Sequence, residues 1–354
     1  MDVRVKKIME SAVANKASDI HMSVGMAPRI RVDGELLEVT GMEKITEAEM
    51  EGMIFSLMNE EKKKQLIKKK ELDFSVQVDE TRFRVNAYFR LGKLSASLRI
   101  IPIVVPPFNS LNIPDTVLSF TQMKQGFVLI TGPTGHGKST TLAAMLTEIA
   151  NTKSVHIVTI EDPVEYILAG SRAIISQREL GDDTNSFAGA LRSCLRQDPD
   201  VAFVGEMRDL ETIQSALTVA ETGHLVFSTL HTNSAAQSID RIIDVFPEHE
   251  KAQVRLQLAS VITAIVSQRL VPAVDGGRLP AVEILVANGA VRNSIREAKT
   301  HMIDNIIQTG GDVGMMTLEM SLAKWVKLGK IDKKVAMNYS LRPGELESRL
   351  RMQV

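Results

Sequence analysis

The pattern of hydrophobic and polar positions divides this chain into two parts. In the first hundred residues, short runs alternate between apolar and polar side chains, which predicts antiparallel strands. Asp33 and Gly34 separate two of these runs, and an Asp-Gly pair is a strong hairpin signal because type I′ turns need positive φ at both positions. The first part, residues 1–103, is therefore predicted to be a small α+β domain. Its predicted strands are 19–22, 28–32, 35–39, 72–78, 82–89 and 94–101, and its predicted helices are 3–15, 46–58 and 60–70.

A pair of prolines marks the end of this part. Pro106 and Pro107 cannot continue a helix or a central strand, so residues 104–113 are the predicted linker. Beyond it the apolar runs are continuous and helical patterns separate them, which predicts a largely parallel sheet covered by helices. From about residue 248 the pattern is mostly helical, and this completes a second predicted domain over 114–354. The predicted strands of this α/β domain are 127–131, 155–160, 201–205 and 225–229.

Composition narrows the class of protein without changing this division. The 354 residues include 44% hydrophobic and 24% charged side chains, as in a globular protein with a substantial core. The net charge of −1, from 42 basic and 43 acidic residues, argues against a surface that coats nucleic acid. Cys194 is the single cysteine, and we expect it to pack in the core in a reducing cytoplasm. No apolar stretch approaches the ~18 residues of a membrane span, so we expect contact with a membrane only through a partner.

The most specific motif reads G-x-x-x-x-G-K-[ST] and lies between an apolar run and a helical pattern. Strand, glycine loop and helix N-terminus together are the context of a phosphate-binding loop. Its glycines let backbone N–H groups turn inward around phosphate oxygens, and the helix dipole favours the negative charge. Lys138 is expected to reach the β- and γ-phosphates, and the Ser139 hydroxyl to bind Mg²⁺. The residues predicted to bind a nucleoside triphosphate are Gly132, Pro133, Thr134, Gly135, His136, Gly137, Lys138, Ser139 and Thr140.

Acidic residues follow two of the later apolar runs, at strand ends where parallel sheets keep their sites. Glu206 follows a run that resembles a Walker B strand, with Gly205 in place of the usual metal-binding Asp. Glu206 is therefore the leading candidate for the general base, against the alternative of a plain exposed glutamate. The second acidic group is a candidate to hold Mg²⁺ or its waters or to polarise the attacking water, against the alternative of a solvated turn. Its members are Glu161, Asp162 and Glu165.

Two histidines bracket one predicted strand. His224 precedes the run at 225–229 and His231 follows it. Metal binding is not expected, because no cysteine or third histidine clusters nearby. Strand ends of this sheet border the predicted nucleotide site, so both histidines are candidates to contact the γ-phosphate or to couple hydrolysis to movement. A purely structural role is the alternative.

These segments together resemble the family of type II/IV secretion ATPases, over most of the chain from near residue 4 to about 325. Within that family they are most similar to the type IV pilus retraction ATPases, and the shorter N-terminal half also fits that group. The four-cysteine zinc cluster common in the assembly and secretion ATPases does not occur in this sequence. The segments that carry the resemblance are 18–21, 82–87, 160–165, 205–212, 229–233 and the retraction-like motif at 290–297.

The resemblance implies a motor that hydrolyses ATP with Mg²⁺ to drive pilus retraction and twitching motility. It implies a homohexamer in the cytoplasm, with a PAS-like N-terminal domain and a RecA-like ATPase domain in each subunit. It also implies docking on an inner-membrane pilus platform protein, which the motor turns, and no binding to nucleic acid. Arg84 and Arg99 resemble fingers that reach the γ-phosphate of a neighbouring subunit, while a solvated basic sheet face is the alternative for them.

Two positions depart from the pattern of that group. His136 stands where the phosphate loop usually has Ser, and Ser294 stands where the retraction motif usually has Leu. We expect position 136 to contribute mainly its backbone N–H. In the motif, helical spacing predicts a packed stripe of Ala290, Val291, Ser294 and Ile295, with Arg292, Asn293, Arg296 and Glu297 free on the other side.

Three other functions remain open on the sequence alone. The first is a pilus-assembly, type II secretion or accessory retraction ATPase of the same family. The second is an ATP-gated scaffold ring that hydrolyses slowly or not at all, although intact Lys138, Ser139 and Glu206 argue against it. The third is a nucleic-acid translocase, which the neutral charge and the 4% of aromatic residues leave without a stacking platform for bases.

Overall fold

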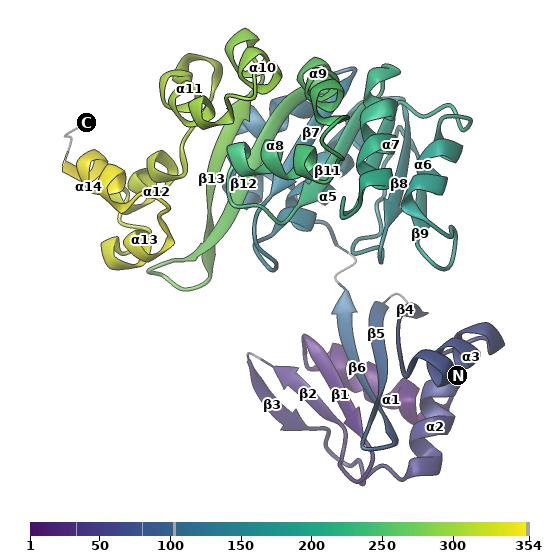
Figure 1. The fold of residues 1–354 in the computed structure, drawn as a ribbon. Helices are drawn as coiled ribbons and strands as arrows, with labels where there is room; N and C mark the ends of the chain where they lie inside the picture. The colour runs from purple at the N-terminus through teal and green to yellow at the C-terminus, as the bar shows by residue number, and fades with distance from the viewer. Residues whose placement is uncertain (33, 80, 102–103, 352–354) are drawn as a thin grey trace. The chain divides into compact units, whose positions relative to one another are not determined.

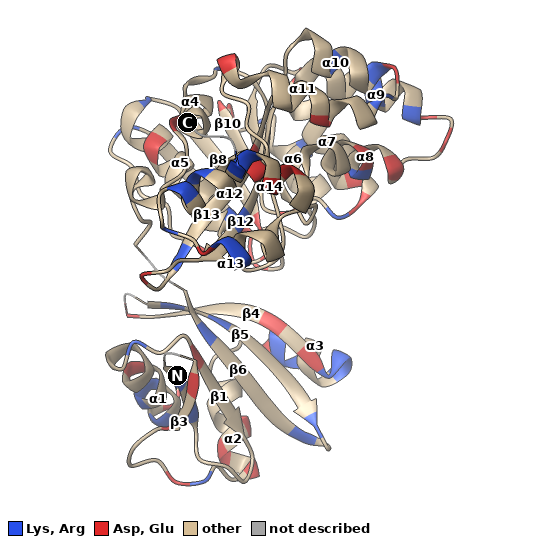
Figure 2. Cartoon of the chain, turned by 90° about the vertical axis from the view of Figure 1, so that its left-hand side faces the viewer, with Lys and Arg blue, Asp and Glu red and all other residues tan. Residues whose placement is uncertain are grey.

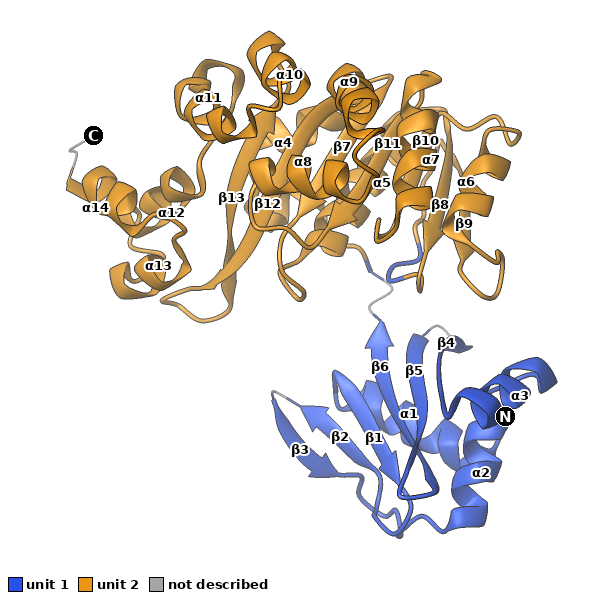
Figure 3. Cartoon of the chain, viewed as in Figure 1, with its two compact units in different colours: residues 1–104, 165–167 blue, residues 105–164, 168–354 orange. Residues whose placement is uncertain are grey.

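The computed structural model describes residues 1–32, 34–79, 81–101 and 104–351, in two compact units. The first unit contains Met1–Val104 and Glu165–Ile167, and the second contains Val105–Val164 and Leu168–Val354 (Figure 3). Each unit has a sheet of its own (Figure 1).

The sheet of the first unit is antiparallel, in the order β3-β2-β1-β6-β5-β4. The small α+β domain was predicted from alternation, and its strands and helices are confirmed. Asp33, half of the predicted hairpin turn, lies outside the described residues, while Gly34 has the expected positive φ of 91°. The elements are α1 (Val3–Ala14), β1 (Asp19–Ser23), β2 (Arg29–Val32), β3 (Glu35–Glu38), α2 (Glu47–Phe55), α3 (Glu60–Lys69), β4 (Glu71–Val78), β5 (Thr81–Arg90) and β6 (Lys93–Ile101).

Strand alternation gives this sheet one apolar and one polar face. Phe74, Val85 and Leu98 lie in register across three strands and are buried with residues of α1, α2 and α3 in one core. One register position away, Asp73 and Asn86 face the other side. Figure 2 shows lysine positions along α3 in blue on this unit.

The sheet of the second unit has the order β13-β12-β7-β11-β10-β8-β9, and only the edge strand β13 is antiparallel to its neighbour. This is the predicted RecA-like α/β core. Helices α6 to α10 pack against one face of the sheet in one hydrophobic core, which includes the buried Cys194. Its strands are β7 (Gly126–Thr131), β8 (His156–Glu161), β9 (Ile174–Glu179), β10 (Val201–Val204), β11 (Leu225–Leu230), β12 (Ile262–Pro272) and β13 (Arg278–Val286).

Some helices of this unit cover the sheet, and others follow its edge strand β13. The short helices η1 (Phe108–Leu111), α4 (Asp115–Ser119) and η2 (Phe120–Gln122) precede β7. Next come α5 (Lys138–Thr152), α6 (Phe187–Cys194), α7 (Leu210–Glu221), α8 (Ala235–Asp244) and α9 (Lys251–Val261). After β13 follow α10 (Gly289–Arg296), η3 (Thr300–Met302), α11 (Ile303–Thr309), η4 (Gly311–Val313), α12 (Leu318–Lys327), α13 (Lys333–Tyr339) and α14 (Pro343–Arg351).

The expectation that the chain is mostly helical from about residue 248 is wrong in one stretch. Helix α9 ends at Val261 and β12 begins at the next residue, so no turn residue announces the change. The apolar run that continues across this point fits a buried helix as well as a buried strand. Edge strand β9 was also missed, because its exposed and half-buried residues include few apolar ones. The helical extension therefore begins only at α10.

The predicted linker does not form one irregular segment. Pro102 and Ile103, at the predicted domain boundary, lie outside the described residues. Phe108–Leu111 forms a short 3₁₀ helix, and Phe108 is buried within the second unit. Among the helices that the structure describes, none is long and apolar enough to cross a membrane.

Candidate active site

The phosphate loop joins the buried strand β7 to helix α5. Gly137 caps α5 with a φ of 82°, which glycine adopts without strain. Gly132 has a φ of 140°, and a Cβ at this position would lie 2.2 Å from the carbonyl oxygen of Gln268. The strand β12, which sequence reasoning missed, thus packs directly against the loop and requires glycine there.

Lys138 is the most buried side chain of the loop, with 8% of its surface exposed. Its ammonium donates to the carbonyl oxygens of Gly132 at 2.8 Å and Pro133 at 3.0 Å. These bonds hold the charge inside the ring of loop backbone, where a phosphate would meet it.

His231 connects the loop with the proposed general base. Its Nδ1 lies 3.3 Å from Thr134 Oγ1 and 3.5 Å from Lys138 Nζ, and its Nε2 lies 3.3 Å from Glu206 Oε1. An ammonium can only donate, so Nδ1 accepts and Nε2 carries the proton that points at the carboxylate. The structure therefore brings Lys138, His231 and Glu206 into one connected group.

Glu206 is held on its other side by Arg208, whose Nη2 donates to Oε2 at 2.7 Å. Partial burial alone would raise the pKa of Glu206, but the hydrogen bonds and charges of Arg208 and His231 outweigh burial and lower it. Glu206 is thus ionised at neutral pH and can accept a proton.

Gly205, which stands in place of the usual Asp beside Glu206, lies where two strands approach closely. A Cβ at position 205 would lie 3.3 Å from both the Glu161 Cα and the Ile160 carbonyl oxygen. The Gly205 N–H also donates to Ile160, so β10 and β8 approach closely at this point. A side chain at 205 would require its neighbours on β8 to give by a few tenths of an ångström.

The acidic group after β8 is divided. Glu161 is buried, and its Oε1 accepts from Thr159 Oγ1 at 2.6 Å and Gln177 Nε2 at 3.1 Å. Asp162 is exposed. The hydrogen bond to Glu206 is the largest cause of the raised pKa of Arg208, and the charge of Asp162 adds a smaller contribution. Glu165 is exposed and belongs to the three-residue segment of the first unit. Across the described part of the chain, no group of three His, Cys, Asp or Glu could hold a metal.

His224 does not join this group within one chain. Strand β11 runs parallel to β7, with Leu225 beside Gly126 and Leu230 beside Thr131. The six residues of β11 span about 20 Å, so His224 lies at the N-terminal end of the parallel strands, whereas the phosphate loop follows their C-terminal end. Its Nδ1 instead contacts Thr222 and the Val219 carbonyl. The expected contact of His224 with nucleotide in its own subunit is therefore corrected.

Sequence reasoning also missed how β12 fixes the loop. The His136 imidazole accepts the Leu270 N–H at 2.9 Å, and Gln268 Nε2 donates to the His136 carbonyl at 2.9 Å. Gln268 also accepts from Thr141 in α5. The side chain of His136 thus anchors the loop, whereas only its backbone was expected to matter.

Arg84 and Arg99 lie in the first unit, directly opposite each other on β5 and β6. Arg99 Nε donates to Asp19 Oδ1 at 2.9 Å, and Arg84 Nε lies 4.0 Å from Asp73 Oδ1. They share one face of the sheet.

The retraction-like motif forms α10. Val291, Ser294 and Ile295 are buried as expected, but Ala290 is exposed. Arg292 is not free: its Nη1 donates to the carbonyls of Ala259 and Ser260 at the end of α9. A cation is favoured there because helix C-termini carry partial negative charge, and sequence spacing could not show the neighbouring helix.

Comparisons with known proteins identify the family of the chain. The family model described as Type II/IV secretion system protein matches residues 2–303. The type IV pilus retraction ATPase PilT of Pseudomonas aeruginosa is 45% identical over 94% of this chain and 96% of its own. The twitching motility protein of Neisseria gonorrhoeae is 47% identical over 86% of this chain and 82% of its own. The crystal structure of the pilus retraction motor PilT with bound ADP matches with a TM-score of 0.91 and 44% identity. The match covers 98% of this chain and 100% of that chain. The chain therefore belongs to the type II/IV secretion system protein family.

Proposed function

We propose that this protein is an ATPase motor that drives retraction of type IV pili. The observation that carries the hydrolytic part is the connected group of Lys138, His231 and Glu206 beside the phosphate loop. Similarity along nearly the whole length to relatives named for pilus retraction and twitching supports the mechanical part.

Nucleotide binding follows from the loop. The backbone N–H groups of Gly132–Ser139 and the N-terminus of α5 would hold the phosphates, with the Lys138 charge at the β- and γ-phosphates. The loop's Thr134 and the nearby His231 would complete the γ-phosphate side.

The residues present fit Mg²⁺ held mainly by Ser139 and phosphate oxygens. Mg²⁺ commonly keeps several waters and takes one or two protein ligands. Glu161 is already engaged by Thr159 and Gln177, so contact through water fits it better than direct ligation. When bound, Mg²⁺ would neutralise phosphate charge; Asp162 and Glu165 stay candidates for water-mediated contact.

Glu206 would take the proton of the attacking water, since its carboxylate is ionised and partly exposed. His231 would keep that carboxylate oriented through Nε2–H while its Nδ1 faces the loop. Arg84 and Arg99 are proposed to complete the site of a neighbouring subunit. His224 stays a candidate for coupling between subunits.

For the assembly we propose a homohexamer in the cytoplasm that docks on the inner-membrane pilus platform protein. The membrane would be reached only through that protein, and nucleic acid would not be bound. Full-length similarity to a pilus retraction motor supports this arrangement.

Two measurements test the proposal. The purified protein should hydrolyse ATP, and deletion of its gene should leave cells hyperpiliated and unable to twitch. Cells without pili would instead identify an assembly ATPase. Normal piliation would point to a secretion or accessory role. A protein that binds ATP but does not hydrolyse it would be a scaffold ring.

A further inference from the structure

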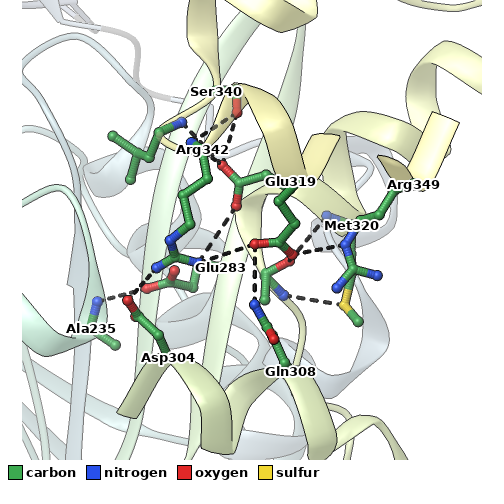
Figure 4. Close-up of polar contacts among 12 residues, drawn as sticks. Ala235, Glu283, Asp304, Gln308, Glu319, Met320, Ser340, Arg342 and Arg349 are labelled. Atoms are coloured by element: carbon green, nitrogen blue, oxygen red, sulfur yellow. Dashed lines mark hydrogen bonds and ion pairs between the residues drawn. The ribbon is translucent and has the colours of Figure 1, made fainter. Parts of the chain in front are cut away.

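A buried acidic cluster lies between the sheet of the second unit and its last helices (Figure 4). Glu283 of β13 and Glu319 of α12 are 2% and 1% exposed. Asp304 of α11 and Glu345 of α14 border them, and Arg342 forms ion pairs with Asp304, Glu319 and Glu345. Burying charges at this cost calls for an explanation beyond packing.

Glu283 touches the start of α8. Its Oε1 accepts the Ala235 N–H at 2.7 Å, and Ala235 is the first residue of that helix. A carboxylate at a helix N-terminus is favoured by the helix dipole as well as by the hydrogen bond. Glu283 thereby helps to hold the start of α8, together with the N-cap Ser234, whose side chain accepts from the Gln237 N–H.

The start of α8 in turn fixes the four residues that separate it from β11. Thr232 Oγ1 lies 2.6 Å from Ser238 Oγ of α8. The Asn233 N–H donates to Gln237 of the same helix at 3.1 Å. His231 begins this segment, so a displaced α8 displaces the imidazole that contacts Glu206.

Arg342 connects the cluster to the C-terminal helices. Its guanidinium pairs with Asp304 and lies 3.9 Å from Glu319 and 3.5 Å from Glu345. Glu319 accepts the N–H groups of Leu341 and Arg342, which ties α12 to the segment before α14.

A second connection runs through β12. Arg269 donates to Asn233 Oδ1 at 3.1 Å and to the Tyr339 carbonyl of α13 at 3.0 Å. The segment after His231 is therefore held both by the cluster and by an arginine that itself contacts the C-terminal helices.

We propose that Glu283 is a positioning residue for His231, and that Arg342 lets the C-terminal helices α12–α14 control ATP hydrolysis through it. The inference rests on the proposed hydrolytic function. Neither residue touches the phosphate loop in the contacts described above, so we expect the effect to fall mainly on turnover, with a smaller effect on nucleotide binding through the contacts of His231 with Thr134 and Lys138.

The charge of Glu283 gives this link a measurable signature. Burial raises the pKa of Glu283 to about 7; Asp304 and Glu319 add to the rise, and the Ala235 N–H and Arg342 oppose it. Arg269 of β12 is a further charged group whose electrostatic field reaches Glu283. The ionised form holds α8 more strongly, so turnover should fall as pH drops through about 7. Glu206 cannot cause that fall, because its pKa is lowered from 4.5.

The test is steady-state ATP hydrolysis by the full chain between pH 6 and 9. Glu283→Gln keeps the hydrogen-bond acceptor and the shape, so its kcat should equal the low-pH plateau of the wild type at every pH. Arg342→Ala should shift the profile to higher pH, and a shift of one pKa unit lowers the ionised fraction about tenfold on the acid side. Arg342→Lys should restore most of the wild-type profile, and KM for ATP should stay within about twofold throughout.

Three controls separate this role from structural support. Arg351→Ala, on α14 but paired only with Glu347 in the contacts described, should match the wild type. Glu283→Gln should have no further effect in a His231→Ala background, and Arg342→Ala none in a Glu283→Gln background. Additive effects, a pH-independent loss in Arg342→Ala, or a wild-type profile in Glu283→Gln would overturn the link. No turnover in the wild type would instead refute the proposed function.

Discussion

His231 contacts both the loop lysine and the candidate base, so one imidazole joins the two groups on which hydrolysis depends. The same arrangement divides their roles. Lys138 supplies charge to bound phosphate, whereas Glu206 acts only on water. Substitutions at the two positions should therefore affect different steps.

Lys138→Ala should abolish ATP binding, since it removes the point charge aimed at the phosphates. Glu206→Gln should retain binding and lose about 10²–10⁴ in turnover, because an amide of the same shape cannot accept the proton. Equilibrium nucleotide binding and single-turnover hydrolysis measure these separately. Glu211→Gln, an exposed carboxylate at the start of α7, is the matched control. Wild-type hydrolysis in Glu206→Gln would move the base to Glu161 or Glu165.

His136→Ser should weaken the attachment of the loop to β12, because the hydroxyl is too short to replace the bond from the Leu270 N–H. The unsatisfied N–H costs about 1–3 kcal/mol if water cannot reach it. Burial first, and then Arg269, Arg278 and Lys138, lower the pKa of His136 from 6.5. Because the pKa of His136 is lower in the folded protein than in the unfolded chain, its neutral imidazole stabilises the fold fully at pH values above the unfolded-state pKa. That contribution is lost as the pH falls through the folded-state pKa.

Thermal unfolding between pH 5 and 8 measures this contribution. The wild type should gain more stability than His136→Ser as pH rises through this range, and ADP should leave the variant faster. Equal pH dependence in both proteins would contradict the buried neutral role. Sequence spacing could identify the loop itself, because the motif is local, but not His136, whose partner lies 134 residues away on an unrecognised strand.

At the scale of elements, local signals were sufficient for the first unit and for the central strands of the second. Asn59 and Thr46 cap α3 and α2, so propensity, caps and alternation agree there. The sequence fails at β12 because a buried helix and a buried strand share the same apolar composition. Because β12 and β13 were not predicted, the contacts of β12 with the phosphate loop and the contact of Glu283 with the start of α8 could not be predicted either.

Helix α10 offers a prediction at this scale. Arg292→Ala should lower the unfolding temperature, because a hydrogen bond from a charged group to a carbonyl contributes about 1.5–3 kcal/mol. Arg296 is exposed, and Arg296→Ala should change stability by less than about 0.5 kcal/mol. If α10 transmits force to a partner, Arg296→Ala should keep ATPase activity and lose pilus retraction in cells. Normal retraction in that variant would remove the coupling role from Arg296, and loss of ATPase activity in parallel would reduce it to structural support.

At the scale of the whole molecule, the candidate hydrolytic residues are divided between two units. The phosphate loop, Glu206 and His231 belong to the second, while Arg84 and Arg99 belong to the first. Like charges directly opposite each other on neighbouring strands destabilise a sheet, and one carboxylate partner for each offsets this only in part. A bound anion such as a γ-phosphate would offset the remaining repulsion between Arg84 and Arg99.

Mixed assemblies test whether these arginines act on a neighbouring subunit. Lys138→Ala protein cannot bind nucleotide itself but carries intact arginines, whereas Arg84→Ala or Arg99→Ala protein binds nucleotide without its finger. Each should be nearly inactive alone, since such a finger supplies about 10³–10⁵ in rate. Mixing them should restore hydrolysis at those interfaces where an intact loop meets an intact arginine. Arg90→Ala, an exposed position on the same strand, should be active alone. If labelled subunits exchange and activity does not return at any mixing ratio, the arginines do not act in trans, and their pair would be a solvated face of the sheet.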